Sequence, residues 1–297
     1  REPLWGWRDD SSEIVERQID LAADCGLSFF AFCWYWHDDG KQIDEKAIRE
    51  DSKHVGLNLY LTAKNNQRLK FCLLVANHGG FEIQGTEQWK QAADFWMPYF
   101  KHPQYLTVGG KPLVIIFHPA GGDQAGFDSM QEKAREAGLP GVVTAGCGGG
   151  ERRLGYTHRT HYNIVPGYDA GSQEHKYAEL VQAHEQAWQG SPQQPYIPEI
   201  TAGWDKRPWE GETGLNQKPG WYFPDRTPEQ FANFLSHAIS WMQKHPEQTT
   251  PERIAVIYAW NEFGEGGYIA PTKGDSQGLY LEAVRTVLKT THVETSQ

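Results

Sequence analysis

The sequence predicts an α/β fold, a (β/α)8 (TIM) barrel whose first β-strand is absent from this chain. Helical and strand patterns alternate along all 297 residues, and each strand pattern leads into a helical one, as in repeated βα units. The strand patterns are continuous apolar runs, which are typical of parallel strands buried on both faces. The fold class rests on these two observations.

The predicted elements begin with a helix. Asp10 and Glu13 form a capping-box pattern, and apolar residues recur at helical spacing after them. Strands are expected over 27–36, 70–77, 112–118, 141–147, 161–168, 196–205 and 253–260. Helices are expected within 44–66 and over 86–101, 123–138, 174–190, from Thr227 onward and around 280–288. The helix at Thr227 has the clearest start, because an N-cap, a proline at the first helical position and a capping box coincide there.

The expected strands are one short of the eight that a (β/α)8 barrel needs. We interpret residues 1–9 as the loop that would follow the missing first strand. A doubly wound open sheet is the competing fold, but it would show a phosphate-binding glycine pattern at an early strand–helix turn, and residues 36–41 have none. No linker or repeat divides the chain, so we expect residues 1–297 to form a single catalytic barrel domain.

The composition excludes some classes of partner. Lys and Arg number 28 and Asp and Glu 38, which gives a formal net charge of -10. An acidic chain offers no basic surface for nucleic acid or an anionic membrane, so neither is expected as a partner. The longest apolar runs are far too short to span a bilayer, so no membrane span is expected either. The 12 Trp, 13 Tyr and 13 Phe are many for a chain of mean hydropathy -0.65, and sugar-binding surfaces are one use of such side chains.

The cysteines give no sign of a metal site or a disulfide framework. Cys25, Cys33, Cys72 and Cys147 lack the spacing of zinc ligands, and we expect no metal and no cofactor. No signal peptide is visible, but Arg1 is not an initiator methionine, so the compartment stays open. A periplasmic or secreted location is expected if the missing N-terminus carried a signal peptide. The oligomeric state is not predicted.

A barrel places functional residues just past the C-terminal ends of its strands. Polar and aromatic residues recur at those positions, and turn chemistry alone would not supply so many Trp and His. The candidate substrate-binding residues are Trp34, Trp36, His37, Asn77, His78, Tyr168, Asp169, Trp204, Asp205, Asn261 and Tyr268. For Trp34 a core position is an equal alternative, and for Asp169 a turn role is the alternative.

Two carboxylates, Glu262 and Glu265, follow the last expected strand directly. In a helical turn, residues three apart bring their Cβ atoms to roughly 5–6 Å. Retaining glycosidases hold their two carboxyl groups about 5–5.5 Å apart, and inverting ones about 6.5–9.5 Å. Two neighbouring carboxylates also raise the pKa of one of them, which keeps an acid protonated. The alternative is an acidic turn that caps a helix, but the neighbouring Trp260, Asn261 and Tyr268 favour a catalytic site.

Four segments together resemble the family-99-like glycoside hydrolase domain. They are FFAFCWYW at 29–36, KFCLLVANH at 70–78, QYLTVGGKPLVIIF at 104–117 and AWNEFGEGGYIAPT at 259–272. The resemblance covers about residues 7–289. It implies a (β/α)8 barrel, a first strand upstream of Arg1, a carbohydrate substrate and hydrolysis with retention of configuration.

The resemblance also implies a role for each carboxylate. Family 99 carries Asn-Glu-Trp-His-Glu at the last strand, where this chain has Asn261-Glu262-Phe263-Gly264-Glu265. Glu262 would deprotonate the sugar 2-hydroxyl, which attacks the anomeric carbon, while Glu265 protonates the leaving oxygen. Glu265 would then activate the water that opens the resulting 1,2-anhydro sugar. The replaced Trp and His leave the α-mannan specificity of family 99 open, and direct attack by a carboxylate nucleophile stays an alternative.

We therefore expect a retaining glycoside hydrolase of a polysaccharide or glycan, with Glu262 and Glu265 as the catalytic pair. Internal (endo) cleavage is expected, because the long loop over 203–226 would form a cleft. The alternative is a barrel protein that binds carbohydrate or serves polysaccharide biosynthesis without hydrolysing it.

Overall fold

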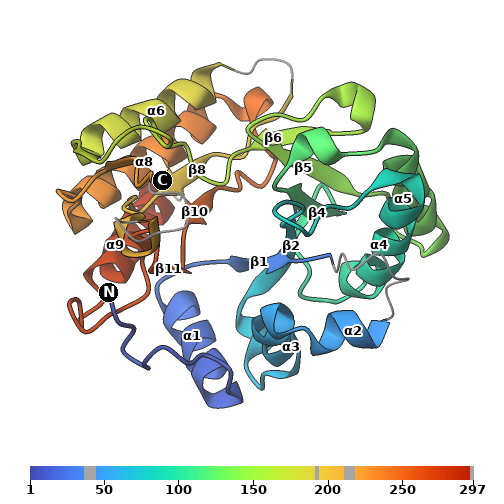
Figure 1. Ribbon diagram of the computed structural model, residues 1–297, viewed down its shortest axis with the longest axis horizontal. Helices are drawn as coiled ribbons and strands as arrows, with labels where there is room; N and C mark the ends of the chain where they lie inside the picture. Colours follow the sequence, from blue (N-terminus) through green and yellow to red (C-terminus); the bar gives the residue numbers. More distant parts are fainter. Residues whose placement is uncertain (37–44, 191–193, 211–217, 295–297) are drawn as a thin grey trace.

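The computed structural model describes residues 1–36, 45–190, 194–210 and 218–294, and it shows a curved layer of strands with helices outside it (Figure 1). Five parallel strands form one continuous ladder in the order β1-β2-β4-β5-β6. Their bounds are Phe29–Trp34, Lys70–Val75, Lys111–Ile116, Val143–Cys147 and His158–Thr160. The short β3 (Thr107–Val108) pairs antiparallel with β4. The predicted α/β class with a parallel sheet is confirmed.

The sheet continues past β6 through shorter contacts. Tyr196 forms a parallel bridge with Arg159, and the Ile197 backbone N–H donates to the Arg159 carbonyl at 2.8 Å. That segment leads into β8 (Glu199–Thr201), which pairs in parallel with β10 (Val256–Tyr258). The arc therefore runs from β1 to β10. Two pairs of two-residue strands in the loops complete the strands: β7 (Gln173–Glu174) with β9 (Trp221–Tyr222), and β11 (Asn261–Glu262) with β12 (Gly267–Tyr268).

The helices pack on the outside of the arc (Figure 1). Their bounds are α1 Ser12–Asp24, α2 Glu45–Glu50, α3 Val55–Thr62, α4 Gly85–Phe100, α5 Gln124–Glu136, α6 Tyr177–Gln189, α7 Arg207–Glu210, α8 Pro228–Lys244 and α9 Leu279–Glu294. α8 begins as predicted, since the Thr227 side chain accepts from the Gln230 backbone and the Gln230 side chain reaches back. α1 begins one residue later than its pattern suggested, with Ser11 as N-cap.

Three expected strands have different bounds. The strand predicted over 161–168 is instead β6, His158–Thr160, because the ladder with β5 pairs Cys147 with Thr160 and ends there. The strands expected over 196–205 and 253–260 are reduced to the short β8 and β10. Gly203 leaves the extended conformation with a φ of 136°, which ends the first of these runs.

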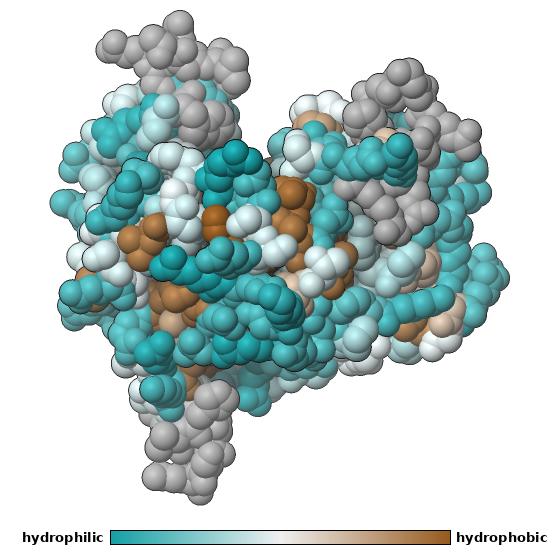
Figure 2. Space-filling view, turned by 90° about the horizontal axis from the view of Figure 1, so that it is seen from below, coloured by the Kyte–Doolittle hydropathy of each residue, from teal (hydrophilic) through white to brown (hydrophobic). Residues whose placement is uncertain are grey.

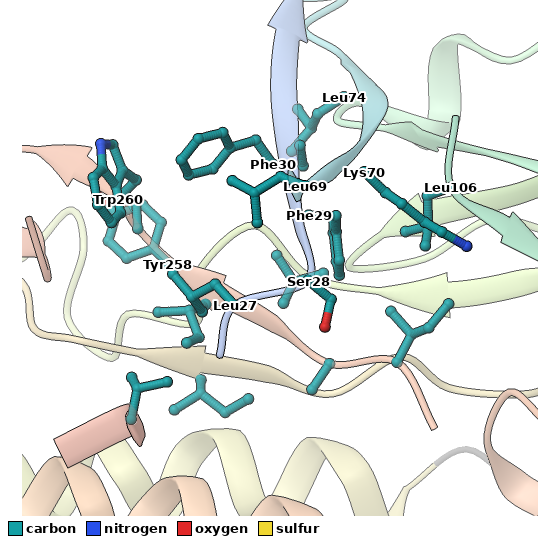
Figure 3. A pocket seen from close by; sticks show the side chains of 18 of the residues that line it. Leu27, Ser28, Phe29, Phe30, Leu69, Lys70, Leu74, Leu106, Tyr258 and Trp260 are labelled. Carbon is teal, nitrogen blue, oxygen red and sulfur yellow. The ribbon is translucent and has the colours of Figure 1, made fainter. Parts of the chain in front are cut away.

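The arc is open between its two ends, β1 and β10. Among the described residues no ladder joins these strands, and a cavity of about 960 Å³ lies along them. Apolar side chains of β1, β10, α8 and α9 line it, and Figure 3 shows Phe30 and Trp260 close to each other at this seam. Their ring centroids are 5.3 Å apart, and Trp260 Nε1 donates to Gln18 Oε1 at 2.7 Å. This is the position where an eighth strand would close the barrel.

Apolar side chains also come to the surface in one region. Figure 2 shows hydrophobic residues gathered in the middle of the face seen from below, with hydrophilic residues over most of the remainder. In the described part of the chain, no helix is both long enough and apolar enough to cross a bilayer.

Candidate active site

The two predicted catalytic carboxylates lie on a β-hairpin that follows β10. Asn261 pairs with Tyr268 and Glu262 with Gly267, so Glu262 is in a strand and Glu265 is in the turn. The Glu265 backbone N–H donates to the Glu262 carbonyl at 3.2 Å, which closes a β-turn in place of the helical turn considered from the sequence. Two glycines make this possible. Gly266 has a φ of 75°, and a Cβ on Gly267 would lie 2.1 Å from the Tyr258 ring.

Each carboxylate accepts a hydrogen bond from its own tyrosine, of which Tyr258 is buried and Tyr162 is half-buried. Tyr162 O–H donates to Glu262 Oε1 at 2.5 Å, and Tyr258 O–H donates to Glu265 Oε2. The two phenol rings meet edge to face, with centroids 5.1 Å apart. Burial, reinforced by the nearby carboxylates, raises the pKa of both phenols well above the ordinary value. Both hydroxyls therefore keep their protons and act as hydrogen-bond donors near neutral pH.

The environment of Glu265 favours its protonated form. Burial is the main cause, and the charge of Glu262 is the second, and together they raise the pKa of Glu265 to about 7. The hydrogen bond from Tyr258 and the positive charge of Lys206 act in the opposite direction. A carboxyl group with a pKa near the working pH can both give and take a proton, which suits a general acid and base.

The β1 side of the site supplies Cys33 and Tyr35. The charge of Glu262 contributes, after burial, to raising the pKa of the Cys33 thiol to about 12. Burial is also the main cause that raises the pKa of Tyr35, and the charges of Cys33, Glu262 and Glu265 add to it. The cavity along the seam reaches Cys33, Tyr162 and Glu262, so it opens onto the same group of side chains. We infer that Cys33 and Tyr35 form the wall of the site opposite the carboxylates.

Trp34 and Trp36 occupy the opposite face of this strand and its continuation. For Trp34 this is the core position that was the equal alternative, and for Trp36 it corrects the expectation of a sugar contact. They are 0% and 1% exposed. Trp34 stacks on His54 with centroids 5.7 Å apart, and Trp36 Nε1 donates to Gln88 Oε1 at 3.1 Å. The two tryptophans point toward α4. Because side chains alternate along a strand, Cys33 and Tyr35 point to the other side, toward the site.

The two predicted substrate residues that follow β2, Asn77 and His78, have different environments. Asn77 is buried and exchanges two hydrogen bonds with the backbone of His118, at 2.9 and 2.8 Å. These bonds tie the ends of β2 and β4 together and use the amide, so Asn77 is not free for a sugar. His78 is exposed, its ring lies 4.4 Å from that of Phe117, and Phe117 in turn contacts Tyr162 at 5.1 Å.

An aromatic row lies on the β8 side of the site. Trp204 is between Tyr168 and Tyr258, with ring centroids at 5.5 and 6.1 Å. Tyr168 is 43% exposed, whereas Trp204 is buried and its indole nitrogen has no hydrogen-bond partner among the described residues. Tyr168 is therefore the member of the row that a bound sugar can reach.

The remaining predicted substrate residues lie around the hairpin and its neighbouring loops. Asp205 is held by ion pairs with Arg207, at 2.8 Å, and with Arg1, and Asp169 and Asn261 are exposed. Tyr268 packs on Phe263 at 5.2 Å and under the Arg226 guanidinium at 4.4 Å. His37 lies outside the described residues.

Four side chains of the site did not stand out in the sequence: Tyr35, Tyr162, Lys206 and Tyr258. The signal for Tyr35 is the alternation of faces along 29–36, and that for Tyr258 is its position at the end of β10. Nothing local marks Tyr162 or Lys206, because their relation to the carboxylates is made by the fold. Within the described ranges no group of three or more His, Cys, Asp or Glu side chains is placed to hold a metal ion.

Comparisons with known proteins identify the family of the chain and the proteins that share its fold. The profile of a family described as glycosyltransferase WbsX matches residues 7–160 and 150–284. Two proteins of Xanthomonas campestris pv. campestris, both described as uncharacterized protein WxcX, are 22% identical over 87% of this chain and 39% of their own length. The chain thus spans about two fifths of these curated relatives.

Solved structures share the fold. A GH99 endo-α-mannosidase of Bacteroides thetaiotaomicron, in complex with bis-tris-propane, superposes with a TM-score of 0.66 at 15% identity, covering 99% of this chain and 89% of the enzyme. A glycoside hydrolase-like protein gives 0.64 at 13% identity, over 96% and 88%. The predicted resemblance to family 99 is confirmed. Sequence identities this low show a similarity of fold alone.

Proposed function

Because the chain belongs to the family described as glycosyltransferase WbsX and has the fold of a GH99 enzyme, we propose that it is a retaining glycoside hydrolase acting on a polysaccharide or glycan. One observation supports this most directly. Glu262 and Glu265 are held by separate tyrosine hydroxyls, and burial raises the pKa of Glu265 to about 7. A carboxyl group that only capped a turn would need neither a tyrosine donor of its own nor a raised pKa.

In the first proposed step, Glu262 takes the proton of the sugar 2-hydroxyl. The 2-oxygen forms a bond to the anomeric carbon as the bond to the leaving oxygen breaks, and Glu265 gives its proton to that oxygen. The product is a 1,2-anhydro sugar, with Glu262 protonated and Glu265 ionised. Tyr258 donates to the carboxylate that forms on Glu265 and stabilises it.

In the second step, water attacks the anomeric carbon and Glu265 takes its proton. The bond to the 2-oxygen breaks, and Glu262 returns its proton to that oxygen. The two inversions give net retention, and both carboxyl groups regain their starting state. Attack by a carboxylate nucleophile on the anomeric carbon is the alternative chemistry for the same pair.

The family description raises a second candidate function, a barrel that serves polysaccharide biosynthesis or only binds carbohydrate. A retaining hydrolase and a transglycosylase break the same glycosidic bond and differ in the acceptor, which is water in one and a sugar hydroxyl in the other. We also propose that cleavage is internal. This prediction comes from the long loop over 203–226, part of which lies outside the described residues.

The test is the release of new reducing ends from plant, algal, yeast and bacterial polysaccharides. The wild type is compared with the Glu262→Gln/Glu265→Gln double variant and with Glu132→Gln, an exposed position on α5. In water enriched in ¹⁸O, a hydrolase labels each new reducing end. We expect labelled ends from the wild type and the Glu132 variant only, and long products if cleavage is internal. Unlabelled transfer products, or binding without cleavage, would favour the second candidate.

A further inference from the structure

Lys206 is a buried cation beside the catalytic pair. The side chain is 2% exposed, and its Nζ lies 3.7 Å from the centroid of the Tyr168 ring. Its charge acts on Glu265. In the part of the chain that the structure describes, no hydrogen bond or ion pair joins Nζ to another residue. The neighbouring Arg207 differs, because its guanidinium is paired with Asp205 at 2.8 Å.

A buried ammonium group without a counterion is costly. The free energy lost when the ammonium group leaves water is larger than the free energy gained from its cation–π contact with one aromatic ring. The acidic groups around it do not compensate. Glu265 is partly protonated near neutral pH, since its pKa is about 7. The charge of Asp169 acts on Tyr168, but among the described residues no ion pair joins the Asp169 carboxylate to Lys206.

The site as a whole would repel an anionic ligand without such a cation. Glu262 and Glu265 bring negative charge to it, and the whole chain has a net charge of -10. A cation placed next to the pair therefore favours the binding of an acidic group there and fixes its position. The exposed ring of Tyr168 beside Nζ supplies an apolar surface for the sugar that carries this group.

We propose that Lys206 binds an anionic substituent of the glycan, a carboxylate or a sulfate or phosphate ester, in a subsite bordered by Tyr168 and Glu265. The chain would thus act on acidic glycans, and this inference rests on the proposed function. Lysine fits the task as a compact point charge, which accepts any of these anions without the planar geometry that arginine demands.

The experiment measures binding and cleavage separately. Lys206→Met removes the charge and keeps most of the length, and Lys206→Arg keeps the charge. Lys244→Met, at an exposed position at the end of α8, is the matched control. Oligosaccharides of polygalacturonate and alginate carry carboxylates, those of carrageenan carry sulfates, and those of mannan and laminarin are neutral. Calorimetry gives affinity, and new reducing ends give turnover.

We expect the wild type to bind acidic oligosaccharides, with a loss of tenfold or more in Lys206→Met, a smaller loss in Lys206→Arg and none in Lys244→Met. The carboxylate and sulfate series identify the kind of anion. Binding of neutral oligosaccharides only, or an equal loss for neutral and acidic ones in Lys206→Met, overturns the inference and makes Lys206 a positioning residue for Glu265.

The two proposals fail in different ways. Acidic oligosaccharides that bind through Lys206 but are not cleaved refute hydrolysis and leave the subsite standing. Cleavage of neutral glycans alone supports the hydrolase and refutes the subsite. Thermal melting provides a further check, because removal of an unpaired buried charge should leave the melting temperature of Lys206→Met equal to or above that of the wild type. A large decrease would reveal a counterion inside the protein and contradict the argument.

Discussion

Replacement of Tyr258 by Phe tests whether the phenol hydroxyl tunes the catalytic acid. The variant keeps the ring, and with it the contacts to Tyr162 and Trp204, but removes the hydrogen bond to Glu265. That bond favours the ionised form of Glu265, since it lowers the pKa that burial raises. Its loss must therefore move the pKa of Glu265 upward.

The size of the shift follows from the energy of the bond. A hydrogen bond to a charged group contributes about 1.5–3 kcal/mol, and a pKa unit corresponds to about 1.4 kcal/mol. The pKa of Glu265, about 7 in the wild type, should therefore rise by about one to two units in Tyr258→Phe. As the general acid, Glu265 must be protonated when substrate binds, so kcat/KM falls as the pH passes its pKa.

The assay is the pH profile of kcat/KM on the substrate found in the polysaccharide screen. In the wild type the alkaline limb should lie near pH 7, and in Tyr258→Phe it should move up by the same one to two units. Tyr280→Phe is the control, because that hydroxyl donates to the Arg226 backbone at 3.2 Å and has no contact with the carboxylates. An alkaline limb at the same pH in all three proteins would refute the reasoning.

Three further predictions concern Glu265, Glu199 and Gly267. Glu265→Gln should lower turnover about 10²- to 10⁴-fold and leave substrate affinity within a factor of two, as measured by initial rates and calorimetry. Glu199 is fully buried, which raises its pKa to about 8, so the folded state holds a proton that the unfolded state loses above its ordinary value of 4.5. Stability from this group is thus present below pH 4.5 and falls as the pH rises toward 8, and Glu199→Gln should flatten that part of a plot of melting temperature against pH. An equally steep fall in the variant would show that other groups cause it. Gly267→Ala would place a Cβ 2.1 Å from the Tyr258 ring and should cost about 1–3 kcal/mol in the free energy of unfolding by denaturant, whereas Gly274→Ala, with its nearest atom at 3.8 Å, should cost little. Equal stability of the two variants would contradict the packing described at Gly267.

Local patterns in the sequence predicted most elements of this fold. The capping box at Thr227 and the apolar runs of β1, β2 and β4 depend on neighbouring residues, and the structure has them as expected. The strand expected over 161–168 failed because its apolar residues pack around the site, whereas the ladder that ends at Thr160 is set by β5, a different segment.

The candidate site shows the same limit. Glu262 and Glu265 could be named from their spacing and position, but the hairpin that orients them depends on pairing between Asn261 and Tyr268. The sequence left Trp34 between a sugar contact and a core position and placed Trp36 at the substrate, since a continuous apolar run does not reveal which side of a strand points toward the site. Tyr162 lies 100 residues before Glu262, and only the curvature of the arc of strands brings them together.

The open seam between β1 and β10 divides the two walls of the candidate site. The carboxylates belong to the chain segment that follows β10, and Cys33 and Tyr35 belong to β1 and its end. Among the described residues, main-chain pairing connects these walls the long way round the arc, through β2, β4, β5 and β6, the bridge between Arg159 and Tyr196, and β8. Across the seam itself the distance depends on side chains, with Trp260 against Phe30 and hydrogen-bonded to Gln18. The width of the site therefore depends on the side-chain contacts across this seam. A small change in the packing of Trp260 would change the distance between the two carboxylates and the opposite wall.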